Sequence, residues 1–222
     1  MGRITSYHPL DRYPSGPWAS VAKPPPRFAD SSCRREPDLE RQFPAITGLC
    51  RPNKTRTFEE GERVAYFTVG THRLAAILEV LERFETHASA ARWYLARNLH
   101  LPRNLMVRGN LPLPHELTCG FYTNAGKRIR PTPMRSPRQL VEEWDALYSA
   151  RQAQAPHVLV CRRLYSNLEN PRHLSTAAAK RVFPRKRFPG TQTPAKVDEA
   201  VIDALAEALG IRLSRPRVPR PR

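Results

Sequence analysis

Residues 50–69, CRPNKTRTFEEGERVAYFTV, decide the fold that we expect for this chain. A basic segment leads into a Glu-Gly-Glu turn, and an apolar stretch follows at residues 63–69. Val, Tyr, Phe and Thr favour strands, so residues 63–69 are predicted to form one. Gly61 supplies the positive φ that a tight turn before this strand requires.

A second strand is expected directly after the first. Residues 73–83 are also largely apolar and follow a short turn that contains Gly70. Their periodicity is compatible with a helix as well as with a strand. The short turn and the alternation of Ile, Leu, Glu and Val favour a strand that pairs antiparallel with residues 63–69.

The rest of the chain adds strands and helices around this pair. Further strands are expected at residues 17–22 and 157–165, and residues 1–17 read as an extended lead-in. Helices are expected at residues 86–99, 136–152 and 196–210, with Thr86 and Ser136 as N-caps and Gly210 at the last C-terminus. These elements predict an α+β protein with a small mixed or antiparallel sheet or barrel and inserted helices.

The predicted domain organisation has four parts. Residues 1–165 form the α+β domain, and residues 166–195 form a basic linker rich in proline. The C-terminal helix at residues 196–210 follows. Residues 211–222 alternate arginine with proline and are predicted to be a disordered basic tail.

Net charge points to a polyanionic partner. The chain carries a formal charge of +17, and 31 of its 37 basic residues are arginine. Such a bias also arises from GC-rich coding. However, residues 97–138 contain eight basic residues and one acid, and residues 180–222 contain eleven and four. Coding bias does not separate acids from arginines in this way, so nucleic acid, either DNA or RNA, is the expected partner.

Several other classes of function are disfavoured. No apolar run approaches the ~20 residues of a membrane helix, and the first residues do not resemble a signal peptide. We therefore expect a soluble cytoplasmic protein without a membrane partner. No glycine-rich nucleotide motif occurs, so no cofactor is expected. The cysteines Cys33, Cys50, Cys119 and Cys161 lack close spacing, which favours reduced side chains over a metal site.

The pattern around the first strand resembles that of a known superfamily. It consists of the 51–53 loop, Phe58, Gly61-Glu62, the strand residues Val64, Tyr66 and Phe67, and the second strand at residues 75–80. This pattern is similar to the PUA-like superfamily, which includes EVE, YTH and ASCH domains, and to nucleotide-modification-associated domains. The resemblance covers about residues 15–84. It implies a PUA-like β-barrel with inserted helices and a basic C-terminal extension, whose rim receives a flipped base.

The resemblance also implies roles for individual residues. Trp18 would stack on the base, Asn53 would bind its polar edge, and Thr68 would face the pocket. The phosphates would be held by Arg51, Lys54 and Arg56. Each residue has a structural alternative: Trp18 can plug the barrel mouth, Asn53 can cap a turn, and Thr68 can pack within the sheet.

The sequence therefore predicts a nucleic-acid-binding protein that reads modified bases or accompanies their modification. A second hypothesis is a hydrolase or base-modifying enzyme on the same scaffold. ASCH-like hydrolases use Lys, Thr and Glu, for which Lys54, Thr55 and Glu79 are available, although their spacing does not require catalysis. A third is a structural protein whose charge only tethers it to RNA or another partner.

Overall fold

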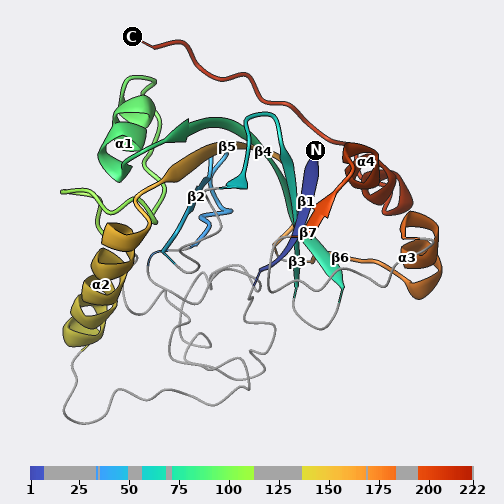
Figure 1. Cartoon of the computed structure of the whole chain (residues 1–222), viewed down its shortest axis with the longest axis horizontal. Coiled ribbons are helices and arrows are strands. Elements are labelled where there is room, and N and C mark those ends of the chain that lie inside the picture. Colours follow the sequence, from blue (N-terminus) through green and yellow to red (C-terminus); the bar gives the residue numbers. More distant parts are fainter. Residues whose placement is uncertain are drawn as a thin grey trace.

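The computed structural model describes residues 1–7, 34, 36–49, 57–68, 72–112, 137–168, 170–183 and 195–221. In this part of the chain, seven strands form one mixed sheet that four helices flank (Figure 1). The strands are β1 Gly2–Tyr7, β2 Ala45–Thr47, β3 Arg63–Thr68, β4 Arg73–Phe84, β5 Val158–Ser166, β6 Arg172–His173 and β7 Ala195–Val197. The helices are α1 His87–Leu95, α2 Pro137–Gln154, α3 Thr176–Val182 and α4 Glu199–Ala208. The strand expected at residues 17–22 lies outside the described residues.

The predicted pairing of the two apolar segments is confirmed. β3 and β4 are antiparallel neighbours, with Val64 opposite Leu78 and Ala65 opposite Ile77. The helical alternative for residues 73–83 is thereby excluded. The strand at 157–165 is also confirmed as β5, which pairs antiparallel with the other edge of β4.

The sheet is open where it is described, rather than closed as the sequence led us to expect. Its strand order is β2-β5-β4-β3-β1-β7, and β6 pairs with β4. The two outermost strands of this order, β2 and β7, do not pair with each other among the described residues. The α+β class is confirmed, but in this part of the chain the strands extend a mixed sheet instead of closing a barrel. The sheet is mixed because β1 pairs parallel to β3, and β1 in turn pairs antiparallel with β7.

β1 was not expected, because its residues read as an extended lead-in. Its Arg3 is only 3% exposed, an unusual environment for arginine in a central strand. The Nε atom of Arg3 lies 2.8 Å from Oε2 of Glu62, and its guanidinium lies 4.3 Å from the centre of the Phe58 ring. The ion pair and the ring contact together allow a charged residue to occupy the sheet interior.

The C-terminal part of the chain joins the same sheet. The stretch predicted as a linker contributes β6 and α3. Residues 195–197 form β7 and not the first turn of the last helix, because the edge of β1 accepts their backbone hydrogen bonds. α4 begins after its N-cap Asp198 and ends before Gly210, whose φ of 61° confirms the predicted terminator.

Close packing of α4 against β1 requires a glycine. A Cβ atom at Gly2 would lie 2.7 Å from Cγ1 of Ile202. Ile202 is fully buried in a cluster with Ile4 and Phe67. The glycine therefore allows the helix to approach the strand directly.

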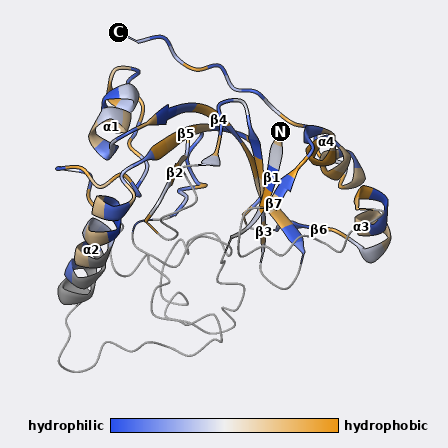
Figure 2. Ribbon diagram, viewed as in Figure 1, coloured by the Kyte–Doolittle hydropathy of each residue, from blue (hydrophilic) through white to orange (hydrophobic). Residues whose placement is uncertain are grey.

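Both faces of the sheet are covered by apolar groups. On one face, Ala65 and Phe67 of β3 join the α3–α4 cluster, and Val158 and Val160 of β5 join a second cluster that includes α1. The residues between these on the same strands, such as Val64 and Leu159, point to the other face and belong to the cluster there. Figure 2 shows the resulting hydrophobic stretches in the middle strands. No helix described in this structure is long and apolar enough to cross a bilayer.

The C-terminal tail, described for residues 211–221, runs from α4 across the molecule toward α1 (Figure 1). Ile211 and Leu213 pack against the α3–α4 cluster, and Val218 packs against the α1 cluster. Between them, the amide of Ser214 donates a 2.9 Å hydrogen bond to the carbonyl of Leu164 in β5. Disorder of the tail stays a prediction, and these contacts identify the residues that would hold the tail in place.

Deletion of residues 211–222 tests whether these contacts hold in solution. A disordered tail predicts no change in stability. The contacts instead lead us to expect a loss of about 2 kcal/mol in the free energy of unfolding, because apolar side chains beneath the tail become exposed to water. Urea unfolding measures the difference. Leu213→Ser and Val218→Ser probe the two contact points separately, and a parent-like midpoint for both variants and the deletion would favour the disordered tail.

Candidate functional site

Most residues of the site predicted from sequence lie outside the described residues: Trp18, Arg51, Asn53, Lys54 and Arg56. Thr68 is described. It is the last residue of β3 and is 1% exposed. Its Oγ1 atom accepts a 3.2 Å hydrogen bond from the amide of Arg73, so it connects the end of β3 to the beginning of β4.

The residues considered for hydrolysis are also only partly described. Glu79 lies in β4, and its Oε2 atom is 2.7 Å from Nε of Arg162 on the neighbouring strand. This carboxylate is thus engaged in a cross-strand ion pair. Lys54 and Thr55 lie outside the described residues. The described residues contain no cluster of His, Cys, Asp and Glu that could hold a metal ion, and Cys161 is a buried free thiol.

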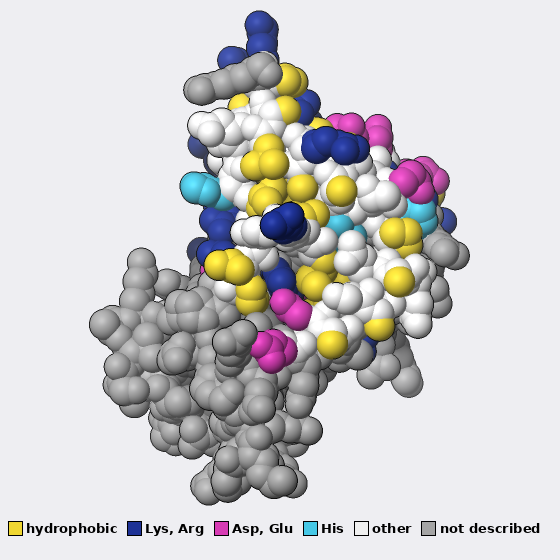
Figure 3. Space-filling view, turned by 90° about the vertical axis from the view of Figure 1, so that its left-hand side faces the viewer, with side chains coloured by type: hydrophobic (Ala, Val, Ile, Leu, Met, Phe, Trp, Pro, Cys, Tyr) yellow, Lys and Arg dark blue, Asp and Glu magenta, His cyan; other side chains and the backbone are white. Residues whose placement is uncertain are grey.

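One concentration of positive charge among the described residues is α1 and the loop that follows it. Residues 86–112 contain four arginines and no acid. Arg92 and Arg108 are exposed and form no ion pair with a described residue. Arg97 lies over the Trp93 ring at 4.3 Å and donates to the carbonyl of Trp93. Seen from the α1 side, arginine and lysine side chains are interspersed with hydrophobic ones (Figure 3).

A pocket of about 460 Å³ opens at the C-terminal end of α1. Its polar lining consists of two arginines, one histidine and two asparagines, and its apolar lining consists of three leucines. These residues are Arg41, Asn98, His100, Arg103 and Asn110, with Leu95, Leu99 and Leu101. No carboxylate lines the pocket, so its chemistry suits an anionic ligand.

One buried carboxylate contacts the side chain of one pocket arginine and the backbone of the other. Asp38 is 1% exposed. Its Oδ2 atom accepts a 2.9 Å hydrogen bond from the amide of Arg103 and lies 3.4 Å from Nε of Arg41. The guanidinium of Arg103 also donates from one terminal nitrogen to the carbonyl of Leu111 at 2.9 Å. Its Nε atom is buried and has no hydrogen-bond partner among the described residues.

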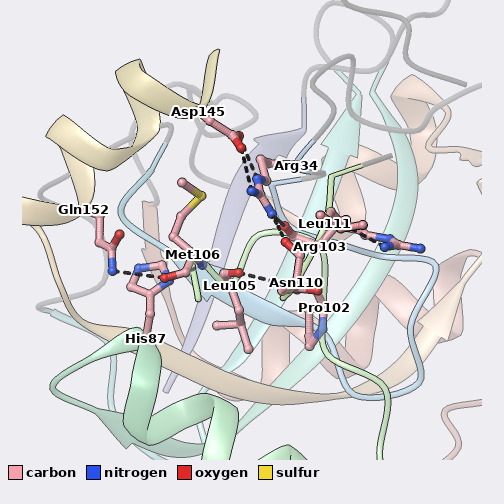
Figure 4. Close-up of polar contacts among 10 residues, drawn as sticks. All are labelled: Arg34, His87, Pro102, Arg103, Leu105, Met106, Asn110, Leu111, Asp145 and Gln152. Carbon is pink, nitrogen blue, oxygen red and sulfur yellow. Dashed lines mark hydrogen bonds and ion pairs between the residues drawn. The ribbon is translucent and has the colours of Figure 1, made fainter. Parts of the chain in front are cut away.

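The loop under the pocket is held by side-chain amides. The Nδ2 atom of Asn110 donates to the carbonyls of Pro102 and Leu105, at 2.8 and 2.7 Å (Figure 4). Asn104 is fully buried, and its Nδ2 atom donates to Glu36 and to the carbonyl of Ala45 in β2. Irregular backbone with few internal hydrogen bonds needs such partners when it is buried. These amides therefore fix the loop to the sheet.

Arg34 ties the same loop to α2. Its Nε and one terminal nitrogen lie 2.9 and 2.8 Å from the two carboxylate oxygens of Asp145, a paired geometry visible in Figure 4. Its other terminal nitrogen donates to the carbonyls of Asn110 and Arg103. The guanidinium thus spans helix and loop, and its burial makes each of these hydrogen bonds costly to lose.

His87 fixes the other side of the loop. It is fully buried at the first position of α1, and its Nδ1 atom accepts a 3.1 Å hydrogen bond from the amide of Met106. Acceptance at Nδ1 assigns the neutral form with the proton on Nε2. Burial, with the nearby Arg34 guanidinium adding to it, lowers the pKa of His87 to about 4.

The C-terminal tail brings a second acid-free segment to the α1 cluster. Residues 211–222 contain five arginines and no acid. Val218 packs on the same cluster as Trp93 and Val107, so the exposed Arg217 and Arg220 flank a contact with α1 and its loop. Neither arginine forms an ion pair with a described residue. Arg215 differs, because it lies close enough to Asp203 to lower the pKa of that carboxyl, although Arg63 lowers it more.

Several buried or partly buried arginines elsewhere in the described fold are paired with acids. Arg63 contacts Glu199 at 2.7 Å and also binds Asp203, and both acids belong to α4. Arg3, Arg34 and Arg162 have the acidic partners already described. The exposed arginines around the α1 cluster that have no acidic partner among the described residues are called the Arg-rich surface below: Arg92, Arg108, Arg217 and Arg220.

Sequence reasoning found the charge of this region but not its geometry. The enrichment at residues 97–138 and 180–222 was visible, yet residues beyond 100 read only as a basic loop. Three spaced asparagines, Asn98, Asn104 and Asn110, could have indicated an ordered loop. Side-chain amides often form hydrogen bonds with buried backbone groups. No family model matches this chain, and no curated protein or solved structure does so either.

The lowered pKa of His87 predicts how stability depends on pH. Between pH 6.5 and about 4, the unfolded imidazole binds a proton that the folded one does not. The free energy of unfolding should be fully maintained above pH 6.5 and should fall by roughly 3 kcal/mol as the pH approaches 4, at ~1.4 kcal/mol for each pKa unit.

Urea unfolding of the parent and of His87→Gln across this range measures the effect. The variant lacks the titrating group, so its stability should depend on pH more weakly than that of the parent. Gln152→Ala is the matched control, because Gln152 contacts the same loop through the carbonyl of Met106 and does not titrate. An unchanged pH dependence in His87→Gln would show that the buried imidazole is not the cause.

Proposed function

We propose that this protein binds nucleic acid through the Arg-rich surface. The observation that carries the proposal is the meeting of two acid-free, arginine-containing segments, residues 86–112 and 211–222, over one apolar cluster. Acids pair with several buried arginines elsewhere in the described fold, whereas no described acid pairs with the arginines of this surface. An exposed group of unneutralised arginines gains free energy from phosphates by releasing their condensed counterions.

The chemistry of the surface fits phosphates better than acidic proteins. Guanidinium groups bind phosphate oxygens in a paired geometry, and arginine is the residue of choice for such contacts. The four arginines come from a helix, a loop and an extended tail. They can therefore contact several phosphates along a polymer rather than a single phosphate. The contacts are to the backbone, and they do not by themselves select a sequence.

Recognition of modified bases is the finer part of the proposal, and it rests on the sequence pattern shared with PUA-like domains. That resemblance assigns base stacking to Trp18 and phosphate contacts to Arg51, Lys54 and Arg56. In the described part of the pattern, β3 and β4 pair antiparallel, and the strands form an open sheet. The Arg-rich surface would hold the strand while the residues of the pattern select the base.

Salt dependence of binding tests the Arg-rich surface. We expect Arg217→Gln/Arg220→Gln to weaken binding of all sequences. The slope of log affinity against log salt should fall by ~0.9 for each phosphate of duplex DNA that the variant no longer neutralises. Fluorescence anisotropy with duplex DNA and single-stranded RNA measures both quantities. The matched control is Lys180→Gln/Arg181→Gln, which removes two exposed charges from α3 at the opposite end of the molecule (Figure 1). Equal effects of the two pairs would mean that net charge alone drives binding.

Base discrimination is tested with oligonucleotides that differ only in a modified base. Trp18→Ala should reduce the affinity difference between them, at a cost of ~1–3 kcal/mol for the stacking that it removes. Arg51→Ala and Lys54→Ala should weaken all oligonucleotides about equally, because they remove phosphate contacts. Melting temperatures of all variants serve as the folding control. If Trp18→Ala discriminates as the parent does, the base is read elsewhere.

A further inference from the structure

We infer that the pocket at the end of α1 binds the phosphate group of a nucleoside monophosphate, such as the terminal phosphate of a nucleic-acid strand. The inference deepens the proposed function, rests on it, and names a ligand for one site within it. The pocket volume of about 460 Å³ falls within the range of small-molecule sites, ~300–1,000 Å³. A single nucleotide is a ligand of this size class.

The polar side of the pocket has unused hydrogen-bond donors. The terminal nitrogens of Arg41 have no hydrogen-bond partner among the described residues, and only its Nε faces Asp38. Arg103 keeps a buried Nε without a partner in the same part of the chain. His100 adds an exposed imidazole to the same lining. The two forked guanidinium groups in the lining match the several oxygens of a phosphate group.

The charge of the site favours a terminal phosphate over an internal one. A phosphate monoester carries a charge of about −1.5 to −2 at pH 7, whereas a phosphodiester carries a single negative charge. Asp38 partly neutralises Arg41, but it lies behind the lining, where it is 1% exposed. The remaining positive charge of Arg41 and Arg103 is therefore best matched by the more highly charged monoester.

The apolar side of the pocket excludes a bare inorganic anion as the best ligand. Leu95, Leu99 and Leu101 are the apolar lining residues, and Leu95 is 62% exposed. An inorganic phosphate would leave these side chains uncovered. A sugar and base attached to the phosphate would cover them and gain apolar burial. Asn98, whose φ is 54°, contributes a carboxamide at the same end of the helix that can bind a base edge.

The experiment compares strands of one sequence that end in a 5′-phosphate, a 3′-phosphate or hydroxyl groups only. We expect a phosphorylated strand to bind the full-length protein about tenfold more tightly than the hydroxyl strand. One additional charge-assisted contact changes the dissociation constant by about this factor. Adenosine 5′-monophosphate should displace the phosphorylated strand at lower concentration than inorganic phosphate does. Isothermal titration with adenosine 5′-monophosphate alone measures the pocket without any polymer.

Two pairs of variants isolate the pocket. Arg41→Gln should abolish the preference for the phosphorylated strand, whereas Arg108→Gln should weaken both strands and keep the ratio. Leu95→Glu places a negative charge at the mouth, while Leu95→Gln has nearly the same shape without the charge. Because Leu95 is largely exposed, both variants should fold, and only Leu95→Glu should lose the preference.

Every result separates this inference from the proposed function. Equal affinity for phosphorylated and hydroxyl strands, with a steep salt dependence retained, overturns the pocket assignment and leaves the Arg-rich surface intact. Binding of adenosine 5′-monophosphate without binding of any strand supports the pocket and overturns the proposed function. Equal competition by inorganic phosphate and the nucleotide overturns the role of the leucines, and with it the assignment of a nucleotide.

Discussion

Burial of β3 on both faces is the constraint on which the rest of the structure depends. A strand that is apolar on only one face can leave the other in water, but β3 places Ala65 and Phe67 on one side and Val64 and Tyr66 on the other. Each side must therefore be covered by another layer. The α3 and α4 helices cover the first side, and Leu39, Ile46 and Phe58 contribute to the second. The edge of β3 that β4 leaves open is filled by β1.

This burial also determines how the acids are used. Arg3 and Arg63 lie in the covered sheet at 3% and 4% exposure, where an unpaired charge would be strongly unfavourable. Glu62 satisfies the first, while Glu199 and Asp203 satisfy the second. Asp145 satisfies Arg34 in the same manner. The described acids all lie outside residues 86–112 and 211–221, so these two segments carry positive charge with no acid of their own. Composition gives the net charge, whereas the structure shows where on the surface that charge lies.

The elements that depend on residues close together in the sequence could be predicted from the sequence. Residues 63–69 and 73–83 have strand-forming side chains and a short turn, and α1 begins after Thr86, whose side chain accepts from the amide of Ser89. β1 and β7 could not be predicted in this way. GRITSY carries an arginine as its second residue, and the acid that pairs with this buried arginine, Glu62, is 59 positions away in the sequence. Residues 195–197 are a strand only because the edge of β1 is open to them.

The candidate site was hidden for the same reason. Its arginines come from position 41 and from position 103, and nothing near either one in sequence indicates the other. Asp38 contacts both segments, because its carboxylate accepts from the backbone amide of Arg103 and forms an ion pair with the side chain of Arg41. In addition, α2 contributes Asp145 to the same loop through Arg34, so helix and sheet position the pocket together.

The buried carboxylate behind the pocket has opposing effects on an incoming anion. Its negative charge weakens the attraction by Arg41, because the two groups partly neutralise each other at 3.4 Å. The same contact restricts a side chain that otherwise loses roughly 2 kcal/mol of rotamer entropy when a ligand immobilises it. Part of the ordering cost is thus met during folding. Affinity for an anion is then limited by the donors that Asp38 leaves unused, which favours a ligand with several oxygens over a single point charge.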